Sequence, residues 1–226
     1  MDAPDALASA AAGMRKQAAC LDVIAGDLAN AGTPGYRASA QTGGQFSHKL
    51  GAASAPPQAQ GALRLTGVAT DVALSGPGYF AVATPDGVRY TRDGRLTADP
   101  NGTLVDVRGN TLLGTLGPVR FPRRAAIESD GRIVAGGRVI DRLRIVDFAG
   151  GADSGNGYYA APARSAIERS TAQVRAGYLE DSGVNPIAEM TALVESQRAF
   201  EANQKAAQRA DETLRRAVTD VPAVHS

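Results

Sequence analysis

The sequence contains no tryptophan, a single cysteine (Cys20) and two histidines (His48 and His225). One cysteine excludes an internal disulfide and a thiolate-rich metal site, and the two histidines are too isolated to bind a metal together. Basic residues (24) and acidic residues (23) nearly balance, and no basic run occurs, so nothing attracts nucleic acid or anionic lipid. No apolar run approaches the length that a membrane-spanning helix requires. The sequence therefore predicts a protein without metal, nucleic-acid partner or membrane insertion.

The N-terminal segment also lacks the features of a cleaved secretory signal. Asp2 and Asp5 lie where such a signal is positively charged, and the alanine-rich residues 6–13 lead to Arg15 and Lys16 without a convincing cleavage site. If the protein leaves the cytoplasm, we expect a route that needs no cleaved signal.

What the sequence does contain begins with an amphipathic pattern over residues 5–30. Its small and apolar residues recur at alternating spacings of four and three, as in the seam where the helices of a coiled coil meet. This stripe consists of Leu7, Ala11, Met14, Ala18, Leu21, Ala25 and Leu28. The predicted helix ends at Asn30 and Gly32, with Pro34 as a breaker. Alanine holds alternate positions of the stripe, so the helix buries little alone and needs a partner.

The middle of the chain changes character twice. Residues 37–62 are rich in Ala, Gly, Ser, Gln and Pro without a period, which predicts an extended or flexible connector. Over residues 66–150, short apolar stretches alternate with Asp-Gly and Asn-Gly dipeptides. This alternation predicts an antiparallel β-domain, either a sandwich or a small barrel.

A second helix is predicted to begin after Asn185 and Pro186, which suit an N-cap and a first helical position, and to run to about Val218. Its predicted seam consists of Met190, Leu193, Gln197, Phe200, Gln204, Ala207, Asp211, Leu214 and Val218. Polar groups inside a seam cost stability and fix register or partner choice.

These elements predict an α+β fold in which long N- and C-terminal helices form a coiled-coil-like pair beside a central antiparallel β-domain. The predicted division is 1–36 for the first helix and its turn, 37–65 for the connector, 66–176 for the β-domain and 177–226 for the second helix. Such a pair would bury only part of its apolar stripe. The remainder would be available to neighbouring copies through heterologous contacts, which allow open helical growth.

Three ordered blocks resemble a known family, the flagellar rod and hook axial proteins. The first is Asp27-Leu28-Ala29-Asn30-Ala31-Gly32-Thr33-Pro34-Gly35-Tyr36-Arg37, similar to a signature of Asn-Leu-Ala-Asn followed by Thr-x-Gly-Tyr. The second comprises Gly76-Pro77-Gly78-Tyr79-Phe80, Thr91-Arg92-Asp93-Gly94 and Asp99-Pro100-Asn101-Gly102, similar to the family's β-domain. The third comprises Gly177-Tyr178-Leu179-Glu180, Val184-Asn185-Pro186 and residues 195–203, similar to its last helix. Asp27 replaces the commoner Asn of the signature, and Pro34 stands inside its Thr-x-Gly step.

The resemblance implies a structural subunit of the flagellar basal-body rod and not an enzyme. It implies terminal helices that line an inner tube, a β-domain in an outer layer, and export by the flagellar type III apparatus into a rod that crosses the periplasm. The implied partners are other copies of the chain and other rod proteins. Length and the compact central region favour the proximal-rod type, with a distal-rod subunit as the alternative.

Two further alternatives come from outside this family. One is a soluble β-domain binding module or enzyme with helical arms, and the other is a non-flagellar adaptor of a secretion needle or phage tail. Catalysis has little support, because Asp93, Asp99 and Asn101 lack the closing Glu of a calcium loop and Cys20 has no histidine nearby. We predict no catalytic, cofactor-binding or metal-binding residues.

The residues predicted to carry function are structural. The predicted assembly interface is Leu7, Met14, Leu21, Leu28, Met190, Leu193, Gln197, Phe200, Gln204, Asp211 and Leu214. The predicted signature turn, which would set the angle between helix and β-layer, is Asn30, Thr33, Gly35 and Tyr36.

Overall fold

The computed structural model of the chain describes residues 3–38, 60–148, 152–153, 157–161 and 168–219. The chain divides into two compact units, one of Met1–Ala29 with Asn185–Ser226 and one of Asn30–Val184. Most of the predicted connector, residues 39–59, lies outside the described residues. Within the described part, neither helix has an apolar stretch that could span a bilayer.

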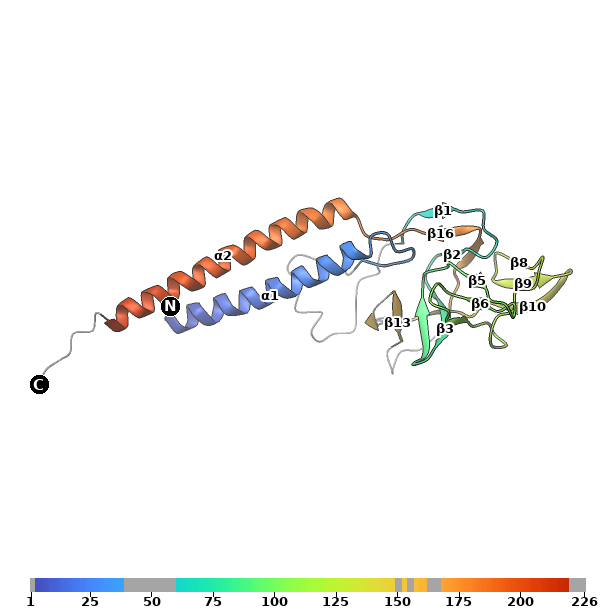
Figure 1. Cartoon of the computed structure of the whole chain (residues 1–226), viewed down its shortest axis with the longest axis horizontal. Helices are drawn as coiled ribbons and strands as arrows, with labels where there is room; N and C mark the ends of the chain where they lie inside the picture. The colour runs from blue at the N-terminus through green and yellow to red at the C-terminus, as the bar shows by residue number, and fades with distance from the viewer. Residues whose placement is uncertain (1–2, 39–59, 149–151, 154–156, 162–167, 220–226) are drawn as a thin grey trace, which may run out of the picture. The chain divides into compact units, whose positions relative to one another are not determined.

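The first unit consists of two helices, α1 (Ala3–Ala29) and α2 (Pro186–Thr219), which lie side by side and run in opposite directions (Figure 1). Asn185 begins α2, because its side-chain oxygen accepts hydrogen bonds from the backbone N–H groups of Ile187 (3.1 Å) and Ala188 (3.3 Å). Pro186 occupies the first helical position, where its missing N–H costs nothing. The predicted start of the second helix is confirmed.

The α+β class and the antiparallel β-domain are confirmed, but the predicted coiled-coil-like helix pair is wrong. A coiled coil buries apolar side chains at both seam positions of each heptad. In α2, Met190, Gln197 and Gln204 of the predicted seam are exposed, and the buried residue facing α1 is Ser196. The helices therefore do not meet through an apolar heptad seam, and polar side chains lie in their contact.

The second unit is built from short strands. They are β1 (Leu63–Leu65), β2 (Val72–Ser75), β3 (Tyr79–Thr84), β4 (Gly87–Thr91), β5 (Thr97–Ala98), β6 (Leu104–Val105), β7 (Thr111–Leu112), β8 (Ala126–Ile127), β9 (Arg132–Ala135), β10 (Arg138–Arg142), β11 (Ile145–Asp147), β12 (Ala152–Asp153), β13 (Tyr158–Ala160), β14 (Glu168–Arg169), β15 (Gln173–Ala176) and β16 (Tyr178–Glu180). Every strand pairing among the described residues is antiparallel.

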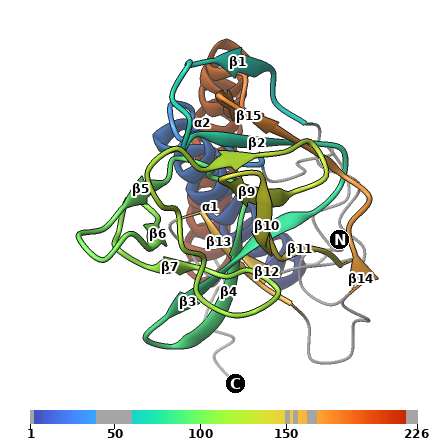
Figure 2. The same cartoon turned by 90° about the vertical axis from the view of Figure 1, so that its right-hand side faces the viewer.

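The strands form several sheets and not one sandwich or barrel. The largest sheet follows the order β12-β13-β4-β3-β7-β6-β5, with β11 paired to both β3 and β14. β8, β9 and β10 form a three-stranded sheet and β1 pairs with β16 (Figure 1), while β2 pairs with β15 (Figure 2). The main path is open at both ends, so the described strands close no barrel.

The predicted turn dipeptides do connect strands. Thr84 pairs with Gly87 at the end of the β3–β4 hairpin, where Gly87 has a φ of 106° that side-chain-bearing residues rarely adopt. The β9–β10 hairpin closes with a pair that was not predicted, Gly136 and Gly137. Both have positive φ, as a two-residue type I′ turn requires.

The core of this unit forms where inward-facing residues of several sheets meet. Its main cluster includes Phe80, Val82, Leu104 and Ile133, all of which are fully buried. A second, smaller cluster is aromatic and includes Tyr90, Phe148 and Tyr159. The ring of Tyr79 stacks on Phe148 at 4.8 Å between centroids and lies beside Tyr159 at 5.1 Å.

One pairing joins segments from the two ends of the β-domain. β1 lies in what the sequence predicted as connector, and β16 in what it predicted as the C-terminal helical part. The two strands pair in the register Leu63↔Glu180, Arg64↔Leu179 and Leu65↔Tyr178. Strand β16 thus becomes the place where distant parts of the chain come together.

Candidate functional site

The face of α1 that is withdrawn from solvent is only partly the predicted one. Ile24 and Asp27 are buried at 1% and 0% exposure, although neither belongs to the predicted stripe. Met14, Leu21 and Leu28 of that stripe are half-buried. The helix turns about 100° per residue, so a contact face centred near Ile24 leaves the predicted stripe on its flank.

On α2, too, the residues that contact the other helix differ from the predicted ones: they lie one position earlier in the sequence. Its polar contact row is Ser196 and Asn203, which are spaced seven apart and lie one residue before Gln197 and Gln204. Ser196 is 4% exposed, whereas Gln197 is exposed. Leu193 and Phe200, at the other position of the predicted seam, are half-buried, as expected for side chains at the edge of a helix contact.

Two contacts define how the helices meet. The Gln17 side-chain amide donates to the Ser196 hydroxyl at 2.5 Å. At Gly13, an added Cβ atom would lie 3.2 Å from the Asn203 amide nitrogen, so the absence of a side chain lets the helices approach closely. The helix pair is therefore held in part by polar contacts, which favour one register over others.

An acidic pair lies near the end of α1 and the start of α2. Asp27 is fully buried, and its carboxylate raises the pKa of Glu189, after the larger effect of burial of Glu189 itself.

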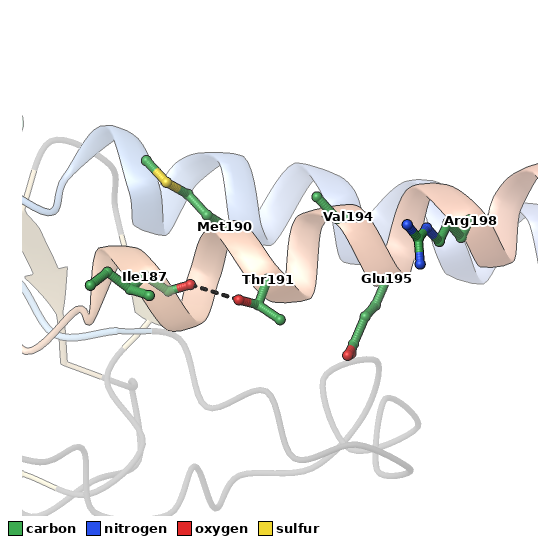
Figure 3. Close-up of a pocket in the computed structure, with 6 residues that line it drawn as sticks. All are labelled: Ile187, Met190, Thr191, Val194, Glu195 and Arg198. Atoms are coloured by element: carbon green, nitrogen blue, oxygen red, sulfur yellow. Dashed lines mark hydrogen bonds between the residues drawn. The ribbon is translucent and has the colours of Figure 1, made fainter.

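The outer face of α2 carries apolar residues that the described chain leaves uncovered. Ile187 is 78% exposed, Met190 54% and Val194 46%. Together with Thr191, Glu195 and Arg198 they line a shallow groove of about 430 Å³ along the first turns of the helix (Figure 3). The Thr191 hydroxyl donates to the Ile187 carbonyl at 3.0 Å, within the same helix. We call Ile187, Met190 and Val194 the α2 ridge.

The predicted signature turn forms a compact, hydrogen-bonded structure. The Thr33 N–H donates to the Asn30 carbonyl (3.0 Å), and the Tyr36 N–H donates to the Thr33 carbonyl (3.2 Å). Gly35 has a φ of 68°, and a Cβ atom there would lie 2.4 Å from the backbone of Arg92. Tyr36 is 6% exposed, so the turn is built into the second unit and does not hang free.

Strand β16 anchors this turn. The Gly35 N–H donates to the Glu180 carbonyl at 2.7 Å, and the Gly183 N–H donates to the Tyr36 carbonyl at 2.9 Å. The turn and the segment leading to α2 therefore hold each other directly through backbone hydrogen bonds.

A buried charge cluster of Arg37, Arg92 and Glu180 lies at the same place. The Glu180 carboxylate is 3.3 Å from Arg92 Nε and 3.7 Å from Arg37 Nη2, and it accepts the Gly61 N–H at 3.2 Å. The Glu180 and Arg92 side chains are 1% and 0% exposed. Arg92 also donates to the Gly76 carbonyl at 2.7 Å.

Burial is the largest cause of the pKa shifts in this cluster. Burial raises the pKa of Glu180, against the smaller opposite effects of the Arg92 and Arg37 guanidiniums. Burial likewise lowers the pKa of Arg92 from its ordinary value to about 10, against the attraction of Glu180. The guanidinium still stays charged at neutral pH, and both shifts favour the uncharged forms, as expected for ions withdrawn from water.

The structure places the predicted interface residues in different environments. Half-buried members are Met14, Leu21, Leu28, Leu193 and Phe200, exposed members are Met190, Gln197, Gln204 and Asp211, and the side chains of Leu7 and Leu214 lie outside the described residues. Asp211 pairs with Arg215 one turn along the same helix at 3.1 Å. The residues of the signature turn, by contrast, are brought together as a unit.

Sequence reasoning missed the charge cluster and the polar contacts of the helix pair. Arg92 and Glu180 stand in the blocks that carry the family resemblance, but no local signal marks them as partners. Gln17 and Ser196 are ordinary helix residues in sequence. In the described part of the chain, no group of three His, Cys, Asp or Glu residues is placed to hold a metal ion.

Comparison with known proteins gives matches over both units. The family described as "Flagellar basal body rod FlgEFG protein C-terminal" matches residues 175–220, and the family described as "Flagellar hook protein FlgE/F/G D1 domain" matches residues 73–135. These ranges contain β16 with α2, and strands β3 to β9, respectively.

Individual relatives match over most of their length. The chain is 34% identical to the flagellar basal-body rod protein FlgF of Mesorhizobium japonicum over 80% of this chain and 83% of the relative. It is 32% identical to FlgF of Caulobacter vibrioides over 88% and 90% of the two chains. It is 31% identical to the rod protein FlgG of Bacillus subtilis over 94% and 97%.

Proposed function

This chain belongs to the flagellar basal-body rod proteins and is a structural subunit of the rod, and from that premise we propose that it polymerises through its terminal helices. In this proposal the rod acts as the drive shaft between motor and hook, and the chain is a subunit of the proximal-rod type. The subunit works by assembly and not by chemistry.

The α2 ridge is the observation that carries the proposal. Ile187, Met190 and Val194 present adjoining apolar side chains on one helix face, and no described part of the chain covers them. Water contact with such a surface is unfavourable, and burial recovers roughly 25 cal/mol per Å² of apolar area. Glu195 and Arg198 flank the ridge and can fix the register of whatever covers it.

We propose that a helix of a neighbouring copy covers this ridge. The half-buried Met14, Leu21 and Leu28 of α1 retain apolar surface that could meet it, and the contact would join different surfaces of two copies. Heterologous contacts of that type propagate into open helical assemblies. The proposed interface comprises Leu7, Met14, Leu21, Leu28, Met190, Leu193, Gln197, Phe200, Gln204, Asp211 and Leu214, with the ridge residues Ile187 and Val194 added.

The partners follow from the family. A basal-body rod subunit assembles with other rod and hook components, and we propose that the contacts run through this interface. We further propose export by the flagellar type III apparatus and a place in the part of the rod that crosses the periplasm.

The sharpest test compares two substitutions at one ridge position. Met190→Asp places a charge in the proposed interface and should abolish incorporation into basal bodies, whereas Met190→Leu keeps an apolar side chain of similar volume and should support motility. Met190 is exposed in the free chain, so both variants should fold alike by circular dichroism. Full motility with Met190→Asp would reject the ridge as an interface.

The rod assignment itself is tested by in-frame deletion of the gene in the source organism. We expect non-motile cells whose basal bodies, seen by electron microscopy, carry a truncated rod without hook or filament. The truncation point separates proximal from distal placement. Complete basal bodies in motile cells, with no second gene copy, would contradict the function.

A further inference from the structure

Three chain segments that are far apart in sequence meet at the end of β16. The signature turn reaches it through Gly35 and Tyr36, which bond to the backbone of Glu180 and Gly183. The chain after residue 59 reaches it as β1, which pairs with β16 from Leu63 to Leu65. The chain then leaves the second unit for α2 between Val184 and Asn185.

The side chain of Glu180 contacts a donor on each of the converging segments. It pairs with Arg37, one residue after the signature turn, and it accepts the N–H of Gly61, two residues before β1. Its third partner is Arg92, directly after β4, whose backbone packs against Gly35. A single buried carboxylate is therefore shared by the turn, the start of β1 and the end of β4.

Sharing an acceptor couples the groups that share it. Withdrawing Arg37 or Gly61 from the carboxylate leaves the remaining buried charges with fewer partners, and buried groups without partners are costly. Opening one segment consequently weakens the attachment of the next.

We propose that Glu180 joins these segments into one cooperative junction, so that the signature turn and the start of β1 open together and not separately. All members of this junction belong to the second unit, Asn30–Val184. It concerns the folded subunit alone and does not depend on how copies polymerise.

The test is amide hydrogen exchange of the full chain, followed by mass spectrometry, in wild type and Glu180→Leu. Leucine removes the acceptor while keeping much of the volume. We expect exchange at residues 35–38 and 61–65 to accelerate together by roughly tenfold or more, with the β9–β10 hairpin unchanged. Absence of local acceleration, or equal acceleration in the hairpin, would overturn the proposal.

Two matched variants sharpen this result. Glu180→Gln keeps an acceptor for the Gly61 N–H but removes the charge that faces Arg37 and Arg92, so exchange at residues 61–65 should accelerate less than in Glu180→Leu. Asp181→Leu makes the same kind of change at the next residue. Its pair with Arg64 lies inside residues 61–65 but is exposed and contributes little, so exchange there should accelerate far less than in Glu180→Leu, and residues 35–38 should be unaffected. Acceleration in Glu180→Gln equal to that in Glu180→Leu would reject the acceptor role.

Arg37→Leu tests the cooperativity directly and decides the matter if Glu180→Leu does not fold. This substitution removes only the ion pair between Glu180 and the residue after the signature turn, and the Arg37 side chain is 12% exposed. A cooperative junction predicts faster exchange at residues 61–65 as well as at 35–38. Acceleration confined to residues 35–38 would overturn the proposal.

Discussion

The Glu180 carboxylate lies 3.3 Å from the Arg92 guanidinium, measured from Oε2 to Nε, and neither side chain has more than 1% of its surface exposed. A buried pair of this kind contributes little net stability, because the cost of desolvating both ions offsets their attraction. What it provides here is geometry, since Arg92 also bonds the Gly76 carbonyl and packs its backbone against Gly35.

Replacing one member of this pair should lower the free energy of unfolding far more than replacing both. Glu180→Leu leaves the buried Arg92 without this counter-charge and the Gly61 N–H without its acceptor, and we expect a loss of roughly 3–5 kcal/mol in the free energy of unfolding. The double variant Arg92→Met with Glu180→Leu should recover most of that loss. Urea denaturation of wild type, Glu180→Leu, Arg92→Met and the double variant measures the cycle, and additive losses would contradict the coupling.

The protonation of Glu180 should make the free energy of unfolding depend on pH. Its pKa is raised by burial above the ordinary 4.5, so the folded state binds this proton more tightly than the unfolded state. The resulting stabilisation is fully present at pH values below the unfolded-state pKa. It is lost as the pH rises through the raised pKa of the folded state. Going from pH 7 to pH 5, the free energy of unfolding of wild type should therefore rise relative to that of Glu180→Gln. Denaturant midpoints at the two pH values give this difference, and a relative fall of wild type would show that the guanidiniums dominate.

The signature turn should tolerate no side chain at Gly35. Gly35→Ala would strain a backbone with φ of 68° and place Cβ 2.4 Å from Arg92, so we expect a loss of about 2 kcal/mol or more. Gly26→Ala is the matched control, because an added methyl there meets nothing within 4 Å inside a helix and should be neutral or stabilising by up to ~1 kcal/mol. Thermal unfolding compares the two, and equal effects would mean that the turn is not held against Arg92.

The helix pair offers a test of its register. Ser196→Leu forces a large side chain into the contact with Gln17 and should destabilise the helices by about 1–3 kcal/mol. Gln197→Leu, which the heptad pattern would place in a seam and make stabilising, changes an exposed residue and should stay within about 0.5 kcal/mol. Loss of helical circular dichroism on heating distinguishes the two. Stabilisation by Gln197→Leu would contradict the contact through Ser196.

Much of the local structure could be read from the chain because it depends on neighbours in sequence. Asn185 and Pro186 begin α2 through hydrogen bonds within a few residues, and Asp86 with Gly87 closes a hairpin through its own backbone conformation. The signature turn is equally local, since Thr33 and Tyr36 bond within the turn. The helix start and the hairpin turn were predictable from composition and spacing, and the signature turn from the family resemblance.

The helix contact was not predictable in the same way. A displacement of one residue, from Gln197 to Ser196, rotates the contact face by about 100°, and the heptad pattern alone could not exclude it. The polar partners Gln17 and Ser196 resemble solvent-facing residues in sequence, and only their position opposite each other makes them a contact.

The sequence by itself determined the α+β composition, the start of α2, the turns and, through its three ordered blocks, the family. The tertiary structure alone decided which helix faces meet and that Arg37, Arg92 and Glu180 share one buried site. The physical reason is that charges and polar groups are favourable inside a protein only beside partners that the fold supplies, and those partners come from segments far apart in the chain.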